Sequence, residues 1–505
     1  MKTTIYIFIL LSLFSPYITY AQADSELLQE VGLPAPNAAA LGKYADYPVG
    51  YFTGVPSVSI PIYSLQQGPL QLPISLNYHA SGIRVAELAS WVGLGWSLDA
   101  GGVISRSVQG LPDDISAGYL NKGKDIMDAG ALYPMPFFQN IGGIEDLPSP
   151  YREGAFQRQE VAKGYIDAEP DIFTFNVGGY AGKFVFDKNQ KIHFLPESDV
   201  KITYDRRDVA NVTRGQIHRF ILTTPEGTRY IFGTLEEEPP ASNSGIEVST
   251  YTGIQSHAVV PTSWYLRRIE SVDRRHSITL EYQEERYTYL SPGSCSITYS
   301  SAGNDHNTGG SRCGPIPYGQ ENTGVSETLM NSKRLSKITH SSGIFTVHFL
   351  ARNDREDISR SLRPTAKRLD LIEIVPTNDP CTKRFVFNYD YFLAKGSGAP
   401  ENSNKPEYKR LRLNSLQESS CDVSIPPYVF SYHPGNLPHR ISKAIDHWGF
   451  FNGAYGNEGT LNVPATAIPS HYGTYFSPNL GNVNRESHEA SMKIGTLKTI
   501  TYPMG

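Results

Sequence analysis

Two acidic segments of the sequence contain residue types that can do chemistry. Asp446 is followed directly by His447, and a carboxylate can orient an imidazole and stabilise its charge during acid–base catalysis. The sequence places no nucleophile beside them, so a hydrolase site near Asp446 and His447 competes with a polar loop in which Asn452-Gly453 forms a tight turn. Glu236–Glu238 could form a glycosidase pair or bind calcium, but three successive carboxylates are typical of a solvated loop. We favour the loop interpretation in both cases.

A glycine-rich stretch from Trp91 to Gly102 is the third candidate site. It lacks the Gly-Lys-Ser/Thr of a phosphate-binding loop, and no strand followed by a helix frames it. Its glycines permit tight turns or close approach of backbone, while Trp91 and Trp96 supply packing area. The stretch predicts a structural plug or corner. The sequence therefore assigns no catalytic, cofactor-binding or metal-binding residue.

Four cysteines lie in the second half of the chain. Their spacings match no C-x-x-C pattern, which argues against a zinc or redox site. An exported chain can form disulfides. Local pairing, Cys295 with Cys313 and Cys381 with Cys421, is one of three possible pairings, and free thiols are the other option.

Residues 1–23 predict a signal peptide. The apolar run Ile5–Phe14 follows Lys2 and precedes Ala21-Gln22-Ala23, which has the pattern of a cleavage site. The run is shorter than the roughly 20 residues of a membrane span, and no later segment is apolar enough to be one. The 505-residue chain carries a formal charge of −5, which disfavours nucleic-acid binding. We expect an exported chain that is periplasmic, at the cell surface or secreted, with no membrane span after cleavage.

Composition and alternation predict an all-β chain, because 45 glycines, 35 prolines and 31 tyrosines suit short strands and turns. In an entry region, residues 24–112, the runs Val55–Tyr63 and Leu70–Tyr78 predict a hairpin whose prolines indicate edge strands or bulges. Periodicity fades over residues 113–168, which we interpret as a long irregular surface excursion. Residues 169–260 predict an antiparallel meander. Its alternating residues are Phe173, Phe175, Val177, Phe184, Phe186, Ile192, Phe194, Phe220, Leu222, Tyr230 and Phe232.

Residues 261–505 contain a degenerate internal repeat. An opening strand with Lys-Arg-Leu, or a looser copy, precedes a strand with three apolar or aromatic residues on one face. A lone two-stranded unit is marginally stable, so the units are expected to stack into a wall. The last opening, Leu497–Gly505, lacks its second strand, and we expect a missing continuation. The openings are Leu266-Arg267-Arg268, Lys333-Arg334-Leu335, Lys367-Arg368-Leu369 and Lys409-Arg410-Leu411; the triplets are Ile278/Leu280/Tyr282, Phe345/Val347/Phe349, Phe385/Phe387/Tyr389 and Tyr428/Phe430/Tyr432.

The charged and aromatic positions of this repeat each have a structural and a functional interpretation. The Lys and Arg of an opening alternate between strand faces, so we expect solvated or cross-strand paired charges rather than a basic stripe for an acidic partner. The tyrosine-rich faces could bind glycans by ring stacking, but a period-two triplet is also what a sheet core needs. A surface adhesin or glycan-binding protein remains the alternative, and it requires exposed, coplanar aromatic rings.

The segment Trp91–Arg106 resembles the entry region of insecticidal toxin-complex B subunits and related virulence proteins (SpvB/TcB-like), whose pattern is G-L-G-W-S-L followed by I-x-R. The later hairpins resemble YD repeats, with the Tyr-Asp ending kept at Tyr389-Asp390. Asp446–Gly453 resembles a D-x-x-G-[FY]-x-N-G element of RHS-type proteins from Bacteroidota. The motif positions are Trp91, Gly93, Gly95, Trp96, Arg106, Asp446, Trp448, Gly449, Asn452 and Gly453.

This resemblance to the RHS/YD-repeat family implies a wound antiparallel β-sheet shell that encloses a polypeptide, usually a toxin or effector encoded at the carboxyl end. The chain would be the amino-terminal part of an exported structural scaffold, with a downstream polypeptide of the same or a linked chain as its partner. It would need neither catalysis nor a cofactor. Members that release their cargo use an aspartyl autoprotease with a D-P-x-G-L core, whereas Asp379-Pro380 continues into Cys381-Thr382, so that activity is not carried over.

Overall fold

The chain of the computed structural model divides into two units, Met1–Pro56 and Ser57–Gly505, and only residues 54–56 of the first are described. The predicted signal peptide, Cys295 and Cys313 lie outside the described residues. No helix in the described part of the chain is long and apolar enough to cross a bilayer. The described ranges are 54–123, 155–156, 159–161, 165–209, 213–239, 242, 244–252, 257–292, 325–378, 380–394, 404–421, 423–457, 466–469, 475–480 and 483–503.

A three-stranded antiparallel sheet, β1-β2-β3, begins the unit. Its strands are β1 (Ser57–Gln67), β2 (Leu70–His79) and β3 (Trp96–Asp99). The predicted hairpin is confirmed, because Leu65 pairs with Leu72 and the register runs to Gln67 opposite Leu70. The register shifts between Pro61 and Tyr63, which is the bulge expected where proline cannot donate to the ladder.

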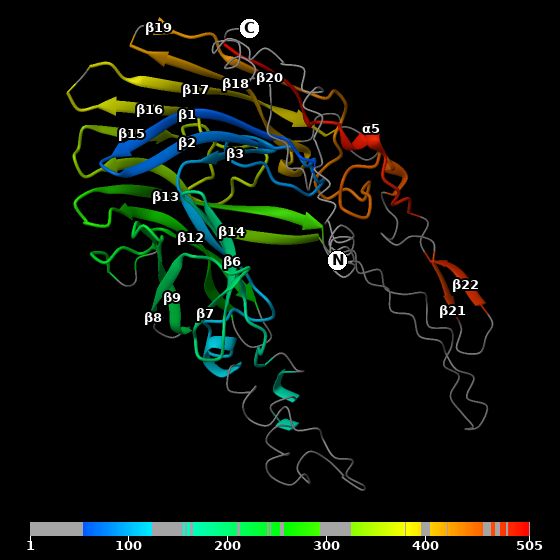
Figure 1. Cartoon of the computed structure of the whole chain (residues 1–505). Helices are drawn as coiled ribbons and strands as arrows, with labels where there is room; N and C mark the ends of the chain where they lie inside the picture. Colours follow the sequence, from blue (N-terminus) through cyan, green and yellow to red (C-terminus); the bar gives the residue numbers. More distant parts are fainter. Residues whose placement is uncertain are drawn as a thin grey trace, which may run out of the picture. The chain divides into compact units, whose positions relative to one another are not determined.

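The second, larger sheet system is also antiparallel, so the chain is all-β (Figure 1). One of its ladders runs β4–β5–β6–β7, another runs β8–β9–β10, and both β4 and β10 pair with β12. The bounds are β4 (Gly102–Ser107), β5 (Ile172–Val177), β6 (Tyr180–Phe186), β7 (Ile192–Leu195), β8 (Lys201–Val209), β9 (Thr213–Thr223) and β10 (Arg229–Gly233).

The repeat region continues this system without a break in pairing. Strands β11, β12, β13 and β14 close a ring of pairings, from which the ladder β14–β15–β16–β17–β18–β20–β23 continues. The bounds are β11 (Ile246–Thr252), β12 (His257–Glu270), β13 (Ser277–Pro292), β14 (Val325–His340), β15 (Phe345–Leu350), β16 (Leu371–Pro376), β17 (Lys383–Leu393), β18 (Lys409–Ser420), β19 (Val423–Ser424), β20 (Tyr428–Tyr432) and β23 (Leu497–Thr501).

Short elements complete the described part of the chain. A separate hairpin pairs β21 with β22. The helical segments span one turn or little more, in keeping with the composition. The bounds are η1 (Tyr119–Gly123), η3 (Pro406–Tyr408), η4 (Tyr455–Asn457), β21 (Thr466–Pro469), β22 (Tyr475–Leu480) and α5 (Glu489–Met492).

A single large core collects the inner faces of the entry sheet, the meander and the repeats. Every residue of the four predicted triplets either belongs to this core or packs against it. The meander contributes close ring contacts, with 5.1 Å between the centroids of Phe173 and Phe184 and 4.9 Å between those of Phe220 and Trp264. The period-two alternation therefore identified the buried face of these strands correctly.

Two local expectations differ from the structure. Residues 113–168 were expected to form a surface excursion, but Asp113 and Asp114 at its start are fully buried, where Asp113 accepts the amide of Asp171, just before β5, and Asp114 accepts from Arg106 of β4. The opening Lys367-Arg368-Leu369 precedes β16 instead of forming a strand. Its Leu369 amide is used elsewhere, since it donates to the carbonyl of Trp91 (3.0 Å).

Candidate functional site

The Gly-Trp block, Trp91–Gly102, docks onto segments of the repeat region that are more than 270 residues away in sequence. The Leu94 amide donates to the Leu411 carbonyl on β18 (2.8 Å), and the Trp91 carbonyl accepts the Leu369 amide. Gly95 has a φ of +76°, and a Cβ there would lie 2.7 Å from the ring of Tyr78. Only glycine meets both demands, the left-handed backbone and the close approach. The glycines thus provide the turns and close approach that the sequence predicted, and Gly93 likewise has a positive φ.

Trp96 is the buried centre of this block. Its indole Nε1 donates to the hydroxyl of Tyr432 on β20 (2.9 Å), and that hydroxyl donates to the Leu413 carbonyl on β18 (2.6 Å). Its ring centroid lies 4.6 Å from that of Phe430 and 5.0 Å from that of Tyr78. One side chain thus joins the entry sheet to the last repeat strands by both packing and hydrogen bonds.

In three of the four repeats, the tyrosine that ends the triplet makes the same kind of hydrogen bond. Its hydroxyl donates to a leucine carbonyl on or just after the preceding opening: Tyr282 to Leu266 (2.9 Å), Tyr389 to Leu369 (2.7 Å) and Tyr432 to Leu413 (2.6 Å). Burial raises the pKa of all three hydroxyls, which keeps them protonated as donors. The remaining repeat has Phe349 at this position and makes no such bond. Sequence periodicity located the tyrosines but not their carbonyl partners.

Tyr389→Phe is expected to lower the free energy of unfolding by about 1 kcal/mol, because it deletes the donor to Leu369 while keeping the ring in the core. Urea denaturation followed by circular dichroism measures the change. Tyr180→Phe is the matched control, since its hydroxyl bonds to Glu226 at the exposed surface, and it should change stability less. Equal effects of the two substitutions would contradict a role for the buried bond.

Arg410 of the opening Lys409-Arg410-Leu411 is buried and bonds to backbone carbonyls, so a solvated or cross-strand paired charge was the wrong expectation for it. Arg410 is 1% exposed and donates to the carbonyls of Pro438 (2.7 Å) and Val85 (2.8 Å). Burial, followed by the charge of Arg440, lowers the pKa of Arg410 to about 9. A buried guanidinium has five donors to satisfy, and backbone carbonyls from distant segments supply the acceptors here.

Other charged residues of the openings form ion pairs, either across strands or with the acidic loop Glu236–Glu238. Lys333 forms an ion pair with its cross-strand neighbour Glu284 (2.6 Å). Glu238 pairs with Arg267 of β12 (2.8 Å), and Glu237 pairs with the neighbouring Arg268. Ion pairs therefore hold the Glu236–Glu238 loop against the first opening, Leu266-Arg267-Arg268. Among the described residues, no group of three or more His, Cys, Asp or Glu side chains is placed to hold a metal ion.

The neighbouring side chains of Asp446 and His447 lie in different environments, one buried and one exposed. Asp446 is fully buried, and its carboxylate accepts the amides of Trp448 and Phe450 (both 2.9 Å) and the hydroxyl of Ser487 (2.9 Å). His447 is exposed. A carboxylate whose acceptor sites hold two amides and a hydroxyl shapes a loop, and this geometry gives it no hydrogen bond to His447.

The loop that Asp446 shapes contacts the entry segment. The Gly449 carbonyl accepts the Val85 amide (2.9 Å), and Asn452 donates through its side-chain amide to the Asn484 carbonyl (2.8 Å). Gly453 has a positive φ, as the tight-turn interpretation requires. Trp448 stands out from this loop with 66% of its surface exposed.

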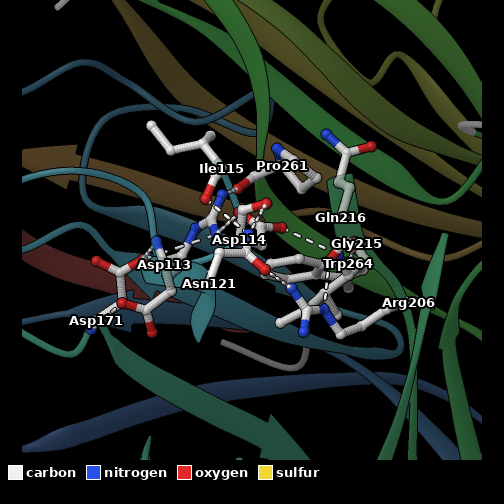
Figure 2. Close-up of polar contacts among 12 residues, drawn as sticks. Asp113, Asp114, Ile115, Asn121, Asp171, Arg206, Gly215, Gln216, Pro261 and Trp264 are labelled. Carbon is white, nitrogen blue, oxygen red and sulfur yellow. Dashed lines mark hydrogen bonds and ion pairs between the residues drawn. The ribbon is translucent and has the colours of Figure 1, made fainter. Parts of the chain in front are cut away.

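Arg106, the arginine of the I-x-R pattern, lies in a buried polar cluster at the junction of β4, β5 and β12. Its guanidinium forms an ion pair with Asp114 (2.7 Å), lies 3.7 Å from Asp171 and donates to the Pro261 carbonyl. The guanidinium carbon of Arg106 lies over the face of the Trp264 ring, 5.5 Å from the ring centroid. Figure 2 shows Asp113, Asp114 and Asp171 gathered beside Trp264 and Pro261. Sequence reasoning selected Arg106 by resemblance but missed its acidic partners, for which the pair Asp113-Asp114 soon after the strand was the available signal.

A disulfide joins Cys381 to Cys421, as in the local pairing scheme. These cysteines flank the paired ends of β17 and β18, where Lys383 lies opposite Ser420. The other two cysteines lie outside the described residues, so the second predicted bridge stays a prediction.

No family model and no curated protein matches the chain. Among solved structures, the chain is similar to TcdB2-TccC3-Cdc42 (11% identity, TM-score 0.34), over 75% of this chain and 16% of that one. It is also similar to TcdB2-TccC3 without its hypervariable C-terminal region (11% identity, TM-score 0.33), over 77% and 16%, respectively. A third likeness, to the N-terminal domain of the effector protein SpvB from Salmonella typhimurium strain LT2 (11% identity, TM-score 0.28), covers 72% of this chain and 98% of that one. The chain thus spans about a sixth of the two TcdB2-TccC3 chains, and these values assign it to no family.

Proposed function

We propose that this protein is an exported structural scaffold, the amino-terminal part of an RHS-type shell that encloses or presents an effector polypeptide of the same or a linked chain. The observation that carries the proposal is the unbroken antiparallel ladder from β13 to β23, whose aromatic triplets all face one core. A continuous ladder with one buried face is what a wall requires.

The placement of the polar side chains also supports a scaffold. Arg410 and Arg106 bind backbone carbonyls, and the Asp446 carboxylate binds backbone amides. The two arginines join segments that are distant in sequence, and Asp446 fixes the shape of its own loop. A hydrolase would instead need the Asp446 carboxylate beside His447 and a nucleophile.

The glycan-binding alternative has less support. It requires aromatic rings exposed side by side on a strand face, whereas the four triplets contribute to the core. Trp448 is exposed, but it stands on a loop and not on a strand face.

Protease protection tests the proposal. The chain is isolated from its native host, a polypeptide continuous with it or bound to it is identified by mass spectrometry, and that polypeptide is digested with trypsin inside and outside the complex. We expect release of its peptides to be slowed about tenfold or more inside the complex, because cleavage must wait for the wall to open.

Two tryptophan variants serve as controls for this experiment. Trp96→Ala should abolish the protection by loosening the joint between the entry sheet and the repeats, and Trp448→Ala should leave it unchanged. Isolation of the chain with no associated polypeptide, or equal digestion rates inside and outside the complex, would argue against the scaffold.

A further inference from the structure

Two buried aspartates tie the start of the 113–168 segment to the strand that follows it. The Asp113 amide donates to Oδ2 of Asp171 (2.9 Å), and the Asp171 amide donates to Oδ1 of Asp113 (3.0 Å). Both side chains are fully buried. Because Asp171 directly precedes β5, this reciprocal pair fixes the register between the turn after β4 and the start of β5.

The charges around this pair do not balance. Arg106 is the cation at its centre, and three carboxylates surround it, those of Asp113, Asp114 and Asp171. Asp114 takes the close ion pair, and its other oxygen accepts the Ile217 amide (3.0 Å). Among the described residues, no group bonds Oδ2 of Asp113. A buried carboxylate oxygen without a donor is costly while charged, and a bound proton removes that cost.

We infer that Asp113 and Asp171 form a proton-dependent clasp, which holds the turn after β4 against the start of β5 while a proton is bound and weakens when it is lost. The clasp would make this junction tighter in mildly acidic than in mildly basic solution. This is a local regulatory device in the wall and is independent of which polypeptide the wall serves.

The groups that face the clasp support this direction of the effect. Burial, then the charge of Asp171, raises the pKa of Asp113 to about 8, against the lowering influence of Arg106. Burial raises the pKa of Asp171 to about 6, again against Arg106. The charge of Asp114 raises the pKa of both aspartates. Burial, followed by the charge of Asp113, also raises the pKa of Tyr119 in η1.

The sign of the pH dependence follows from these raised values. The folded clasp binds protons more tightly than the unfolded chain, whose aspartates titrate near pH 4. The contribution of the clasp to stability is therefore complete below about pH 4 and is lost as the pH rises through about 6 to 8.

Hydrogen exchange of the full chain, measured by mass spectrometry at pH 5.5, 7.0 and 8.5, tests the inference. After correction for intrinsic rates, peptides covering residues 109–121 and 165–177 should exchange about tenfold faster at pH 8.5 than at pH 5.5. Peptides from β15 and β16 serve as the internal reference, and they should not change.

Two neutral variants separate the clasp from a general weakening. Asp113→Asn keeps an oxygen that can accept the Asp171 amide and removes the charge, so the acceleration at pH 8.5 should shrink to the smaller part that Asp171 contributes. Asp114→Asn weakens the ion pair to Arg106 instead, so exchange should rise at every pH with the pH dependence retained. A flat pH profile for the wild-type peptides, or an unchanged slope in Asp113→Asn, would overturn the inference. If Asp113→Asn does not fold, Asp171→Asn takes its place; it also loses one of the two amides that Asp171 accepts, so exchange should rise at every pH while the pH dependence shrinks.

Discussion

Replacing Arg106 with methionine is expected to lower the free energy of unfolding by about 3–5 kcal/mol. Arg106 and Asp114 are both fully buried, and the ion pair is supported by bonds from Arg106 to the Pro261 carbonyl and from the Ile217 amide to Asp114. Removing the cation leaves a buried carboxylate uncompensated, and that residual charge is the main source of the cost. Methionine fills most of the volume, so little of the effect should come from a cavity.

Urea denaturation monitored by circular dichroism measures this loss. Arg268→Met is the matched control, because Arg268 pairs with Glu237 at a site where the glutamate side chain is 55% exposed. An exposed pair contributes about 1 kcal/mol or less. Similar losses for the two variants would show that burial of the Arg106 pair has no special importance.

The second large effect is expected for Trp96→Ala, at about 3–5 kcal/mol. The substitution empties a site enclosed by Tyr78 and Phe430 and deletes the donor to Tyr432. Because the same side chain joins the entry sheet to β20, we expect local exchange protection to fall in both segments together.

Trp448→Ala is the control, since it removes the same side chain from a site that is 66% exposed. Its effect should stay within about 0.5 kcal/mol. Thermal unfolding and hydrogen exchange of β2 and β20 distinguish the two variants. Loss of protection in only one of these strands after Trp96→Ala would contradict the proposed joint.

Local pattern was enough to predict the strands and their buried faces. Phe385 and Phe387 are two residues apart, so a strand must send both to one side, and both are buried. The first hairpin was predictable for the same reason, since its turn and its alternation lie within 25 residues.

The buried polar contacts were not predictable, because periodicity reports which face is buried and not which distant segment lies opposite. Arg410 was expected to be solvated or paired across strands, but its acceptor, the Val85 carbonyl, lies 325 residues away in sequence. Asp113 and Asp171 are separated by 58 residues of weak pattern, which gave no sign that their carboxylates meet. Asp446 was placed in a polar loop by sequence, whereas the amides it accepts became evident only from the backbone geometry.

The docking of the entry sheet onto the last repeats has a consequence for how the chain folds. Trp96 bonds to a residue 336 positions further on, and the Tyr78 hydroxyl accepts the Leu497 amide across 419 positions. Such pairings close very long loops, and topologies dominated by them fold slowly. During synthesis, the residues made first must wait for nearly all of the described chain to be made before their final partners exist. The amino-terminal sheet should therefore mature last, although it is translated first.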